Sequence, residues 1–264
     1  MKYRLISQKL LIILFWILIW QAADTYLQND IIFAGPADVA HSLLMLVPTG
    51  GFWNSISGSF GRISLGFFGA FLSGILIGSL AFRLRFLADL LDPVILLMKS
   101  IPVASFVILA LIWIGSENLA IFISFMVVFP ILYVNTITGL RSTDRRLLEM
   151  AGVFSVSLWG RIRCIYLPAL LPYLTSGCKI ALGMSWKSGI AAEVIGVPAH
   201  TIGENLYMSK IYLATADLFA WTLVIILVSA LFEKLFLKLM QVTVVLISQN
   251  KARRTTDAGK GETP

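Results

Sequence analysis

The chain has 264 residues, of which 58% are hydrophobic and only 13% are charged, and its formal net charge is +7. Its mean hydropathy of +0.87 lies far from the balance of a soluble domain and indicates a membrane protein. Several apolar runs reach the roughly 20 residues that a helix needs to cross a hydrocarbon core of about 30 Å. The residue-by-residue alternation of a transmembrane β-barrel is missing. We therefore predict an all-α, polytopic membrane fold.

Six apolar segments predict six membrane crossings. They cover residues 5–26, 60–82, 87–114, 117–139, 169–192 and 216–240. The first segment follows basic residues, as a signal peptide would, but its apolar run is long and Gln21-Ala22-Ala23 is a poor cleavage site, so we interpret it as an anchor. Residues 1–250 are expected to form one transmembrane domain. The polar residues 251–264 are expected to form a flexible cytoplasmic tail.

Basic residues are distributed unevenly between the two sides of this six-crossing arrangement. Residues 27–59 contain no Lys or Arg, and 194–215 contain Lys210 alone. Inserting chains retain basic residues on the cytoplasmic side, so we expect a multi-pass protein of the cell membrane with both termini cytoplasmic. The positive charge then reflects topology, and no nucleic-acid partner is expected. The residues on the predicted cytoplasmic side are Lys2, Arg4, Lys9, Arg83, Arg85, Arg141, Arg145, Arg146, Arg161, Arg163, Lys251, Arg253, Arg254 and Lys260.

Two features in the first third of the chain predict surfaces that pack against the membrane or against another helix. An apolar run at 39–47, bounded by Gly35-Pro36 and Pro48, predicts a short helix lying on the outer membrane surface. Small residues recur every four positions in the second crossing, a spacing that lets helices approach closely. These are Gly66, Ala70, Gly74 and Gly78. Whether they pack within one subunit or across a dimer stays open.

The connection between the fourth and fifth crossings, residues 141–168, is long for a compact bundle, which indicates a functional loop. Its pattern predicts two short helices. Ser142 or Thr143 is expected to cap the first, with Asp144 in its first turn, and Ser157 is expected to cap the second. In the second helix an apolar stripe is predicted, with arginines facing elsewhere. The stripe is Leu158, Ile162 and Ile165, and the arginines are Arg161 and Arg163.

The stretch EMAGVFSVSLWGRIRCIYLP, residues 149–168, resembles the EAA loop of binding-protein-dependent ABC-transporter permeases. That loop has a Glu, two small residues, a Gly six positions after the Glu, and an Ile-x-Leu-Pro close. Here Glu149, Met150 and Ala151 take the first places, Ser155 takes the Gly place, and Ile165-Tyr166-Leu167-Pro168 forms the close. Met150 and Ser155 depart from the pattern, and Ser155 lacks the freedom of the Gly that normally permits the bend.

The resemblance implies a coupling helix that docks in a cleft on a cytoplasmic ATPase. Ala151 and Ser155 would set the close approach and the bend, Glu149 would make a polar contact with the ATPase, and Leu167-Pro168 would pass motion into the fifth crossing. We expect the bend to be shared between Ser155 and the Ser157 cap, with Pro168 beginning the next crossing. The alternative is an amphipathic segment that only lies on the membrane surface. The predicted coupling residues are Glu149, Ala151, Ser155, Ser157, Ile165, Leu167 and Pro168.

Shorter motifs narrow the resemblance, which covers residues 35–240, to the nitrate, sulfonate, taurine and bicarbonate branch. They are Arg62, Lys99-Ser100-Ile101-Pro102, Trp186 and Ala191-Ala192-Glu193. Ionisable residues deep in a bilayer usually face the bundle interior or a watery cavity. Lys99 and Lys179 are expected near mid-depth, Pro102 is expected to kink its helix, and Trp186 and Glu193 share one helical face with Lys179. The predicted translocation pathway is therefore Lys99, Pro102, Lys179, Trp186 and Glu193.

Each pathway residue has a structural alternative. The lysines, with Lys187, can pair with Glu193, Asp89 or Asp92, or extend to an interface. Pro102 can be a packing kink only, Arg62 an anchor at a membrane end, and Trp186 a residue of the aromatic belt. Cys164 and Cys178 have neither disulfide nor metal spacing.

The sequence contains no GxxxxGK[ST] motif, so no ATP site is predicted in this chain. The resemblance implies the permease subunit of an ABC importer for a small solute, an oxyanion such as nitrate, sulfonate or taurine. Its partners would be an ATPase dimer that uses ATP and Mg²⁺, a second permease subunit in a homodimer, an extracytoplasmic solute-binding protein and the lipid bilayer. No catalytic residue, metal or cofactor of its own is expected.

Two other classes are weighed against this one. An ATP-independent transporter or channel predicts an internal repeat or mid-membrane carboxylates, and neither is evident. A membrane enzyme predicts clustered reactive side chains, whereas His41 and His200 lie outside the predicted crossings without obvious partners.

Overall fold

The computed structural model describes the backbone of residues 2–29 and 31–258, and every regular element in this part of the chain is a helix. The elements are α1 (Lys2–Leu27), α2 (Pro36–Leu46), α3 (Gly50–Arg83), α4 (Arg85–Ser100), α5 (Val103–Ile114), α6 (Ser116–Arg141), α7 (Arg145–Val153), α8 (Leu158–Arg161), the π-helical turn η1 (Ile162–Tyr166), α9 (Leu167–Gly196), α10 (Ile202–Ile211) and α11 (Thr215–Ala258).

Four helical stretches among the described residues are long and apolar enough to cross a membrane. They are Leu10–Leu27, Gly50–Arg83, Ser116–Arg141 and Leu158–Gly196, and α4 with α5 makes a fifth if that bent pair counts as one span. The all-α, polytopic fold is therefore confirmed. The sixth predicted segment, 216–240, lies within α11, which is not among these stretches. Six crossings therefore stay a prediction. Part of the predicted tail, 259–264, lies outside the described residues.

The predicted third crossing, 87–114, is not one straight helix. It breaks between α4 and α5, whose axes differ by 107°. Ile101 and Pro102 at the break have extended ψ angles of 128° and 125°. Pro102 has no N–H to donate and its ring disfavours a helical conformation at the preceding residue, so the chain leaves the helix before the proline. The predicted kink is confirmed at this position, and it is a full break.

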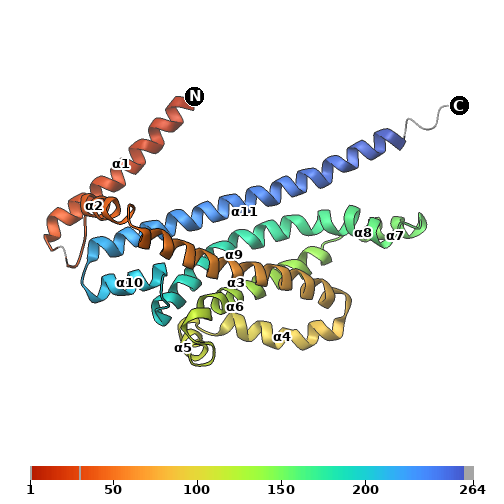
Figure 1. Cartoon of the computed structure of the whole chain (residues 1–264). Helices are drawn as coiled ribbons and strands as arrows, with labels where there is room; N and C mark the ends of the chain where they lie inside the picture. The colour runs from red at the N-terminus through yellow and green to blue at the C-terminus, as the bar shows by residue number, and fades with distance from the viewer. Residues whose placement is uncertain (1, 30, 259–264) are drawn as a thin grey trace.

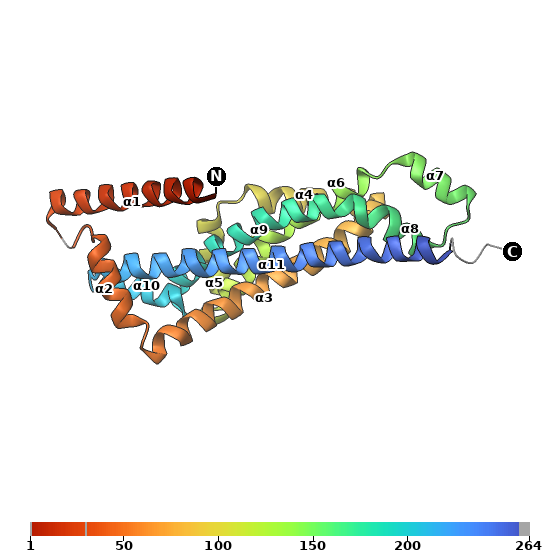
Figure 2. The ribbon, with the colours of Figure 1, turned by 90° about the horizontal axis from the view of Figure 1, so that it is seen from above.

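The core is built from α3, α6 and α9, which lie side by side along the bundle (Figures 1 and 2). The small-residue stripe of α3 packs against α6 inside the subunit, which answers the question left open by the sequence. A Cβ on Gly74 would lie 2.9 Å from the Cβ of Leu132, and one on Gly78 would lie 2.9 Å from the Cβ of Thr136. Only glycine allows the backbones to come this close.

The ends of the bundle carry different elements. Figure 1 shows α1 and α2 at one end and α7 and α8 at the other, with α11 running along the bundle between them. The α2 helix predicted from the sequence is present and is held to α11 by a 2.6 Å hydrogen bond from Ser42 Oγ to Asp217 Oδ1. In contrast, α1 projects from the bundle, and the large apolar side chains from Leu10 to Ile19 are exposed.

Candidate functional site

The loop at one end of the bundle begins with a capped helix. The Asp144 carboxylate accepts a hydrogen bond from the Arg146 N–H at 2.9 Å, so Asp144 itself is the N-cap of α7. The sequence prediction of Ser142 or Thr143 in that place was wrong, because α6 continues to Arg141 and its last turn takes up Ser142. The cap fixes where α7 starts relative to the membrane helix before it.

The bend after α7 is a Schellman motif centred on Ser155. The Val156 N–H donates to the Ala151 carbonyl at 2.9 Å and the Ser155 N–H donates to the Gly152 carbonyl at 3.1 Å. This pattern requires a left-handed residue, and Ser155 has a φ of +50°. The sequence placed the bend correctly, and the motif explains why the resembling family has a Gly here.

The second half of the loop continues into the membrane without a break. Ser157 caps α8 as predicted, since its Oγ accepts from the Gly160 N–H at 3.2 Å. However, α8 passes through the π-helical turn η1 directly into α9, and Leu158–Gly196 forms one helical stretch of 39 residues. Pro168 therefore lies in the first turn of α9 instead of starting a separate helix. Its ring would crowd the carbonyl four residues earlier in a regular α-helix, which accounts for the wider turn.

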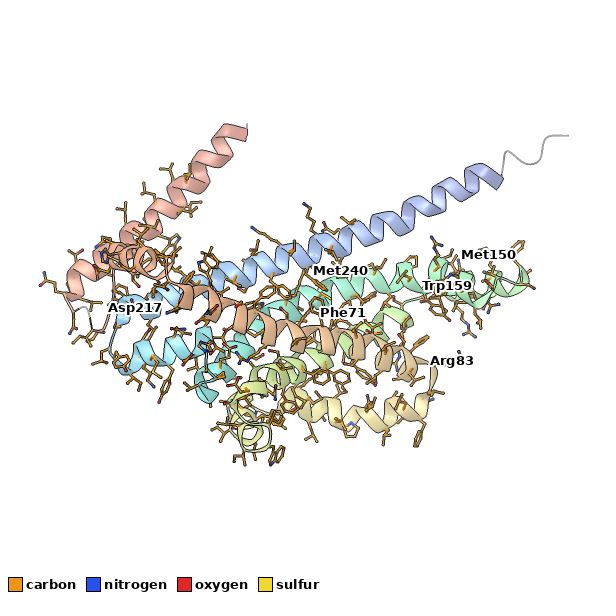
Figure 3. All side chains as sticks on the ribbon, viewed as in Figure 1. Phe71, Arg83, Met150, Trp159, Asp217 and Met240 are labelled. Atoms are coloured by element: carbon orange, nitrogen blue, oxygen red, sulfur yellow. The ribbon has the colours of Figure 1, made fainter. Side chains whose placement is uncertain are left out.

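Large apolar side chains point outward from this loop. Figure 3 shows Met150 and Trp159 at this end of the bundle. The exposed large apolar residues are Leu147, Met150, Val153, Phe154, Leu158, Trp159 and Ile162. Glu149 is also exposed and pairs with Arg145 one turn earlier, with 3.6 Å between the charged atoms. An exposed apolar cluster of this kind marks a surface that contacts another protein or the membrane.

The remaining predicted coupling residues lie inside the loop or at its base. Ala151 is 1% exposed and Ile165 is buried, so both pack within this chain. The Arg161 side chain was predicted only to face away from the apolar stripe of the second helix, and its contact with the turn was not predicted. Its Nε donates to the Val156 carbonyl at 3.0 Å and its Nη2 to the Ala151 carbonyl at 3.4 Å. No periodic pattern signals such a contact, because it depends on the turn between the helices.

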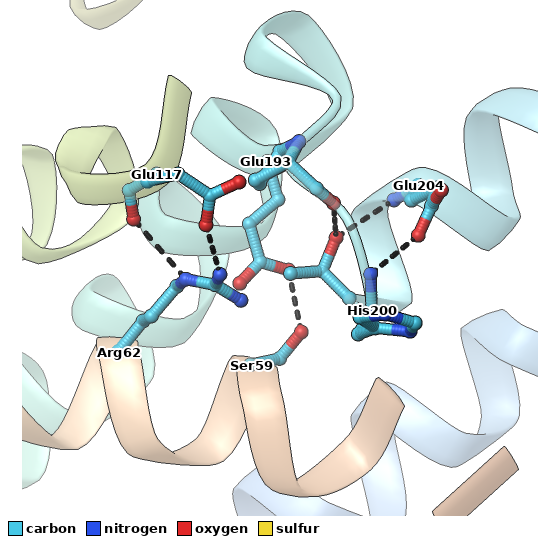
Figure 4. Close-up of polar contacts among 8 residues, drawn as sticks. Ser59, Arg62, Glu117, Glu193, His200 and Glu204 are labelled. Atoms are coloured by element: carbon cyan, nitrogen blue, oxygen red, sulfur yellow. Dashed lines mark hydrogen bonds and ion pairs between the residues drawn. The ribbon is translucent and has the colours of Figure 1, made fainter. Parts of the chain in front are cut away.

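The opposite end of the bundle contains a buried glutamate network (Figure 4). Glu193, near the end of α9, is 0% exposed, and its Oε2 accepts from Ser59 Oγ of α3 at 2.6 Å and from the Gly203 N–H of α10 at 3.2 Å. Ser59 Oγ in turn accepts from the Ile202 N–H at 2.8 Å. The carboxylate therefore sits at the N-terminus of α10, where the helix dipole favours negative charge.

Two more polar contacts border this network. Arg62 of α3 forms an ion pair with Glu117 at the start of α6, and its Nε also donates to the Glu117 carbonyl at 3.1 Å. The His200 N–H donates to the Glu204 carboxylate at 2.6 Å. Sequence reading missed Ser59, Glu117 and Gly203 as partners, because a single sequence does not show which helices pack against each other.

The other predicted pathway residues occupy different environments. Lys99, Pro102 and Lys179 are exposed on the subunit, whereas Trp186 is buried in the core with Glu193. The ion pairs among the described residues are Arg62–Glu117 and Arg145–Glu149, and neither includes a lysine. Beside the α4–α5 break lies a small apolar cavity of about 30 Å³. Its lining residues are Met98, Ile101, Val103, Phe106, Ile123, Met126 and Val127.

These features define a polytopic helical membrane protein with a structured loop at one end and a broken helix within its span. Comparison with known proteins identifies the family. The profile of the binding-protein-dependent transport system inner membrane component matches residues 70–241, which include the whole α7–α8 loop and Glu193. The chain belongs to this family and is the transmembrane permease subunit of an ABC importer. It is a multi-pass protein of the cell membrane.

The relatives agree with the branch indicated by the sequence motifs. The chain is 27% identical over 220 residues to the taurine transport system permease protein of Escherichia coli, covering 81% of this chain and 80% of the relative. It is 34% identical over 172 residues to the bicarbonate transport system permease protein of Synechococcus elongatus, covering 62% and 61%. It is 28% identical over 188 residues to the nitrate import permease protein of the same organism, covering 67% of each chain.

Proposed function

We propose that this permease receives its energy through the α7–α8 loop, which we infer to be the docking surface for a cytoplasmic ATPase. The observation that carries the proposal is the form of the loop: two short helices at a defined bend, with large apolar side chains exposed. The chain has no nucleotide motif of its own. ATP and Mg²⁺ are therefore used by the separate ATPase, and this chain binds no cofactor and catalyses no reaction.

The loop residues divide into a contact set and a transmission set. Glu149 and the exposed apolar residues contact the ATPase, while Ala151, Ser155 and Ser157 keep the two short helices in place. Ile165, Leu167 and Pro168 lie at the start of the helical stretch that continues through α9. Displacement of the loop therefore moves α9 directly, because no flexible connection separates them.

We further propose that two copies of this subunit work with an ATPase dimer and an extracytoplasmic solute-binding protein by alternating access. Both termini are cytoplasmic, and α11 provides the sixth crossing. The exposed apolar faces of α1 suit lipid or a second copy. The binding protein rests on the α2 end, which carries no Lys or Arg from residue 31 to residue 59.

The proposed cargo is a small oxyanion, such as nitrate, a sulfonate or taurine. The support is the exposed lysines on apolar helices, together with the substrates in the relatives' names. We propose that Lys99, Pro102 and Lys179 line the pathway between two subunits. Trp186 and Glu193 support that surface from within the subunit, since both are buried.

Co-purification tests the docking surface. The Glu149→Arg and Phe154→Arg variants place a positive charge on the exposed loop without touching its internal hydrogen bonds, so we expect them to lose the ATPase and solute uptake. Tyr212→Arg, at an equally exposed aromatic residue at the opposite end, is the control for ATPase association. If the ATPase stays bound to both loop variants and uptake is unchanged, the docking assignment is wrong.

A further inference from the structure

The Arg161 guanidinium spans the turn between α7 and α8. Its Nε donates to the Val156 carbonyl at 3.0 Å and its Nη2 donates to the Ala151 carbonyl at 3.4 Å. These carbonyls belong to the two ends of the Schellman turn, and the Ala151 carbonyl also accepts the Val156 N–H that closes it. One rigid, forked group thus holds the last turn of α7 and the beginning of the α8 segment together.

The turn that Arg161 spans is under strain. Ser155 adopts a φ of +50°, a conformation that an L-residue populates roughly tenfold less readily than glycine does. Without the Arg161 side chain, only the backbone hydrogen bonds of the Schellman motif would oppose the opening of this turn. Hydrogen bonds from a charged donor are stronger than neutral ones, and the Arg161 side chain is partly shielded from water. The two hydrogen bonds from Arg161 therefore stabilise the closed turn.

We propose that Arg161 is a positioning residue for transport: it keeps α7 at a fixed angle to the α8–α9 helix and so compensates for Ser155. The inference rests on the proposed docking of an ATPase at this loop. A force on the α7 surface reaches α9 only if the turn between them does not yield. Arg161 lies directly before η1 and is part of the helix that the force must move. Its contribution is therefore to the transfer of motion, without contact with the ATPase or the solute.

The first experiment measures the turn itself, in the full-length permease in lipid nanodiscs. Spin labels are placed on the exposed native Cys164 and on an Arg146→Cys variant of α7, while Cys178 is fully buried and does not react. Wild type should give a narrow distance distribution. In Arg161→Ala the open arrangements should increase about tenfold relative to the closed one, equivalent to about 1.4 kcal/mol. Adding Ser155→Gly should restore the narrow distribution, since glycine removes the strain.

Arg163→Ala is the matched control. It removes the same charge two residues from Arg161, and the Arg163 side chain makes no described hydrogen bond. It should leave the distribution narrow. A narrow distribution in Arg161→Ala, or a broad one that Ser155→Gly does not narrow, overturns the inference. This measurement contains no ATPase, so its outcome is independent of whether the docking proposal is correct.

The second experiment measures ATP hydrolysed per solute transported in the reconstituted complex. Arg161→Ala should still bind the ATPase but require severalfold more ATP per solute, and the Ser155→Gly addition should restore the ratio. A residue with only a folding role would lower the yield of the complex and leave this ratio unchanged. An unchanged ratio with a broadened turn overturns the positioning role, whereas ATPase binding that survives Glu149→Arg and Phe154→Arg refutes the docking proposal instead.

Discussion

Replacing Glu193 should destabilise the end of the bundle that holds α10. The carboxylate is 0% exposed and accepts hydrogen bonds from Ser59 Oγ and from the Gly203 N–H. Glu193→Ala leaves both donors buried without an acceptor. Each unsatisfied donor costs about 1–3 kcal/mol, and the lost side chain adds a cavity. The free energy of unfolding should fall by roughly 3–5 kcal/mol.

Glu193→Gln separates the hydrogen bonds from the charge. The amide oxygen can accept the same two bonds, and the amide nitrogen takes the place of Oε1, which has no hydrogen-bond partner. The charge-assisted component is lost, but so is the cost of burying an ionised group. The two changes oppose each other, so Glu193→Gln should lie within about 1 kcal/mol of wild type.

Hydrogen exchange at the start of α10 provides the assay, because the Gly203 amide and the Ile202 amide depend on this network. In Glu193→Ala their protection should fall by about 10²–10⁴, which follows from roughly 3–5 kcal/mol at about 1.4 kcal/mol per tenfold change. Glu233→Ala on α11 is the matched control, since Glu233 makes no described hydrogen bond. Protection in Glu193→Ala that equals the control would refute the argument that this carboxylate holds α10 in place.

Two further predictions concern helix packing and orientation. Gly74→Ala should lower the free energy of unfolding by about 1–3 kcal/mol, because the new Cβ meets Leu132 and the Tyr133 backbone. Gly61→Ala on the same helix, where a Cβ meets nothing within 4 Å, should not, and equal effects in a denaturant titration would contradict the packing. A membrane-impermeant maleimide should label the exposed Cys164 in inside-out vesicles and not in intact cells, and labelling in intact cells would reverse the proposed orientation.

Sequence patterns predicted the local structure correctly where neighbouring residues determine it. The helical character, the bend at Ser155, the Ser157 cap and the break at Pro102 all follow from side chains acting within a few positions. Sequence patterns do not show where distant positions meet. Helical spacing places Glu193 on the same face as Lys179, but spacing cannot show that Ser59 and α10 cover it.

The continuity of the loop with α9 was not predicted, for a related reason, although Pro168 does lie in the first turn of α9. Pro168 was read as the start of a helix, since proline is favoured there. The structure tolerates it inside a continuous stretch because η1 widens the turn just before it. A sequence pattern indicates where a regular α-helix is disfavoured, and it does not distinguish a π-helical turn from a break. The difference matters here, because a break would separate the loop from α9.

The continuous helical stretch Leu158–Gly196 connects the two ends of the molecule. At 1.5 Å per residue its 39 residues extend roughly 58 Å, enough to pass through the membrane and beyond it. Arg161 fixes the loop at one end, and Glu193 fixes α3 and α10 at the other. A helix attached at both ends transfers displacement only as far as each attachment holds. Weakening either one should therefore uncouple transport while the helix itself remains intact, and comparing Arg161→Ala with Glu193→Ala should show which attachment limits the transfer.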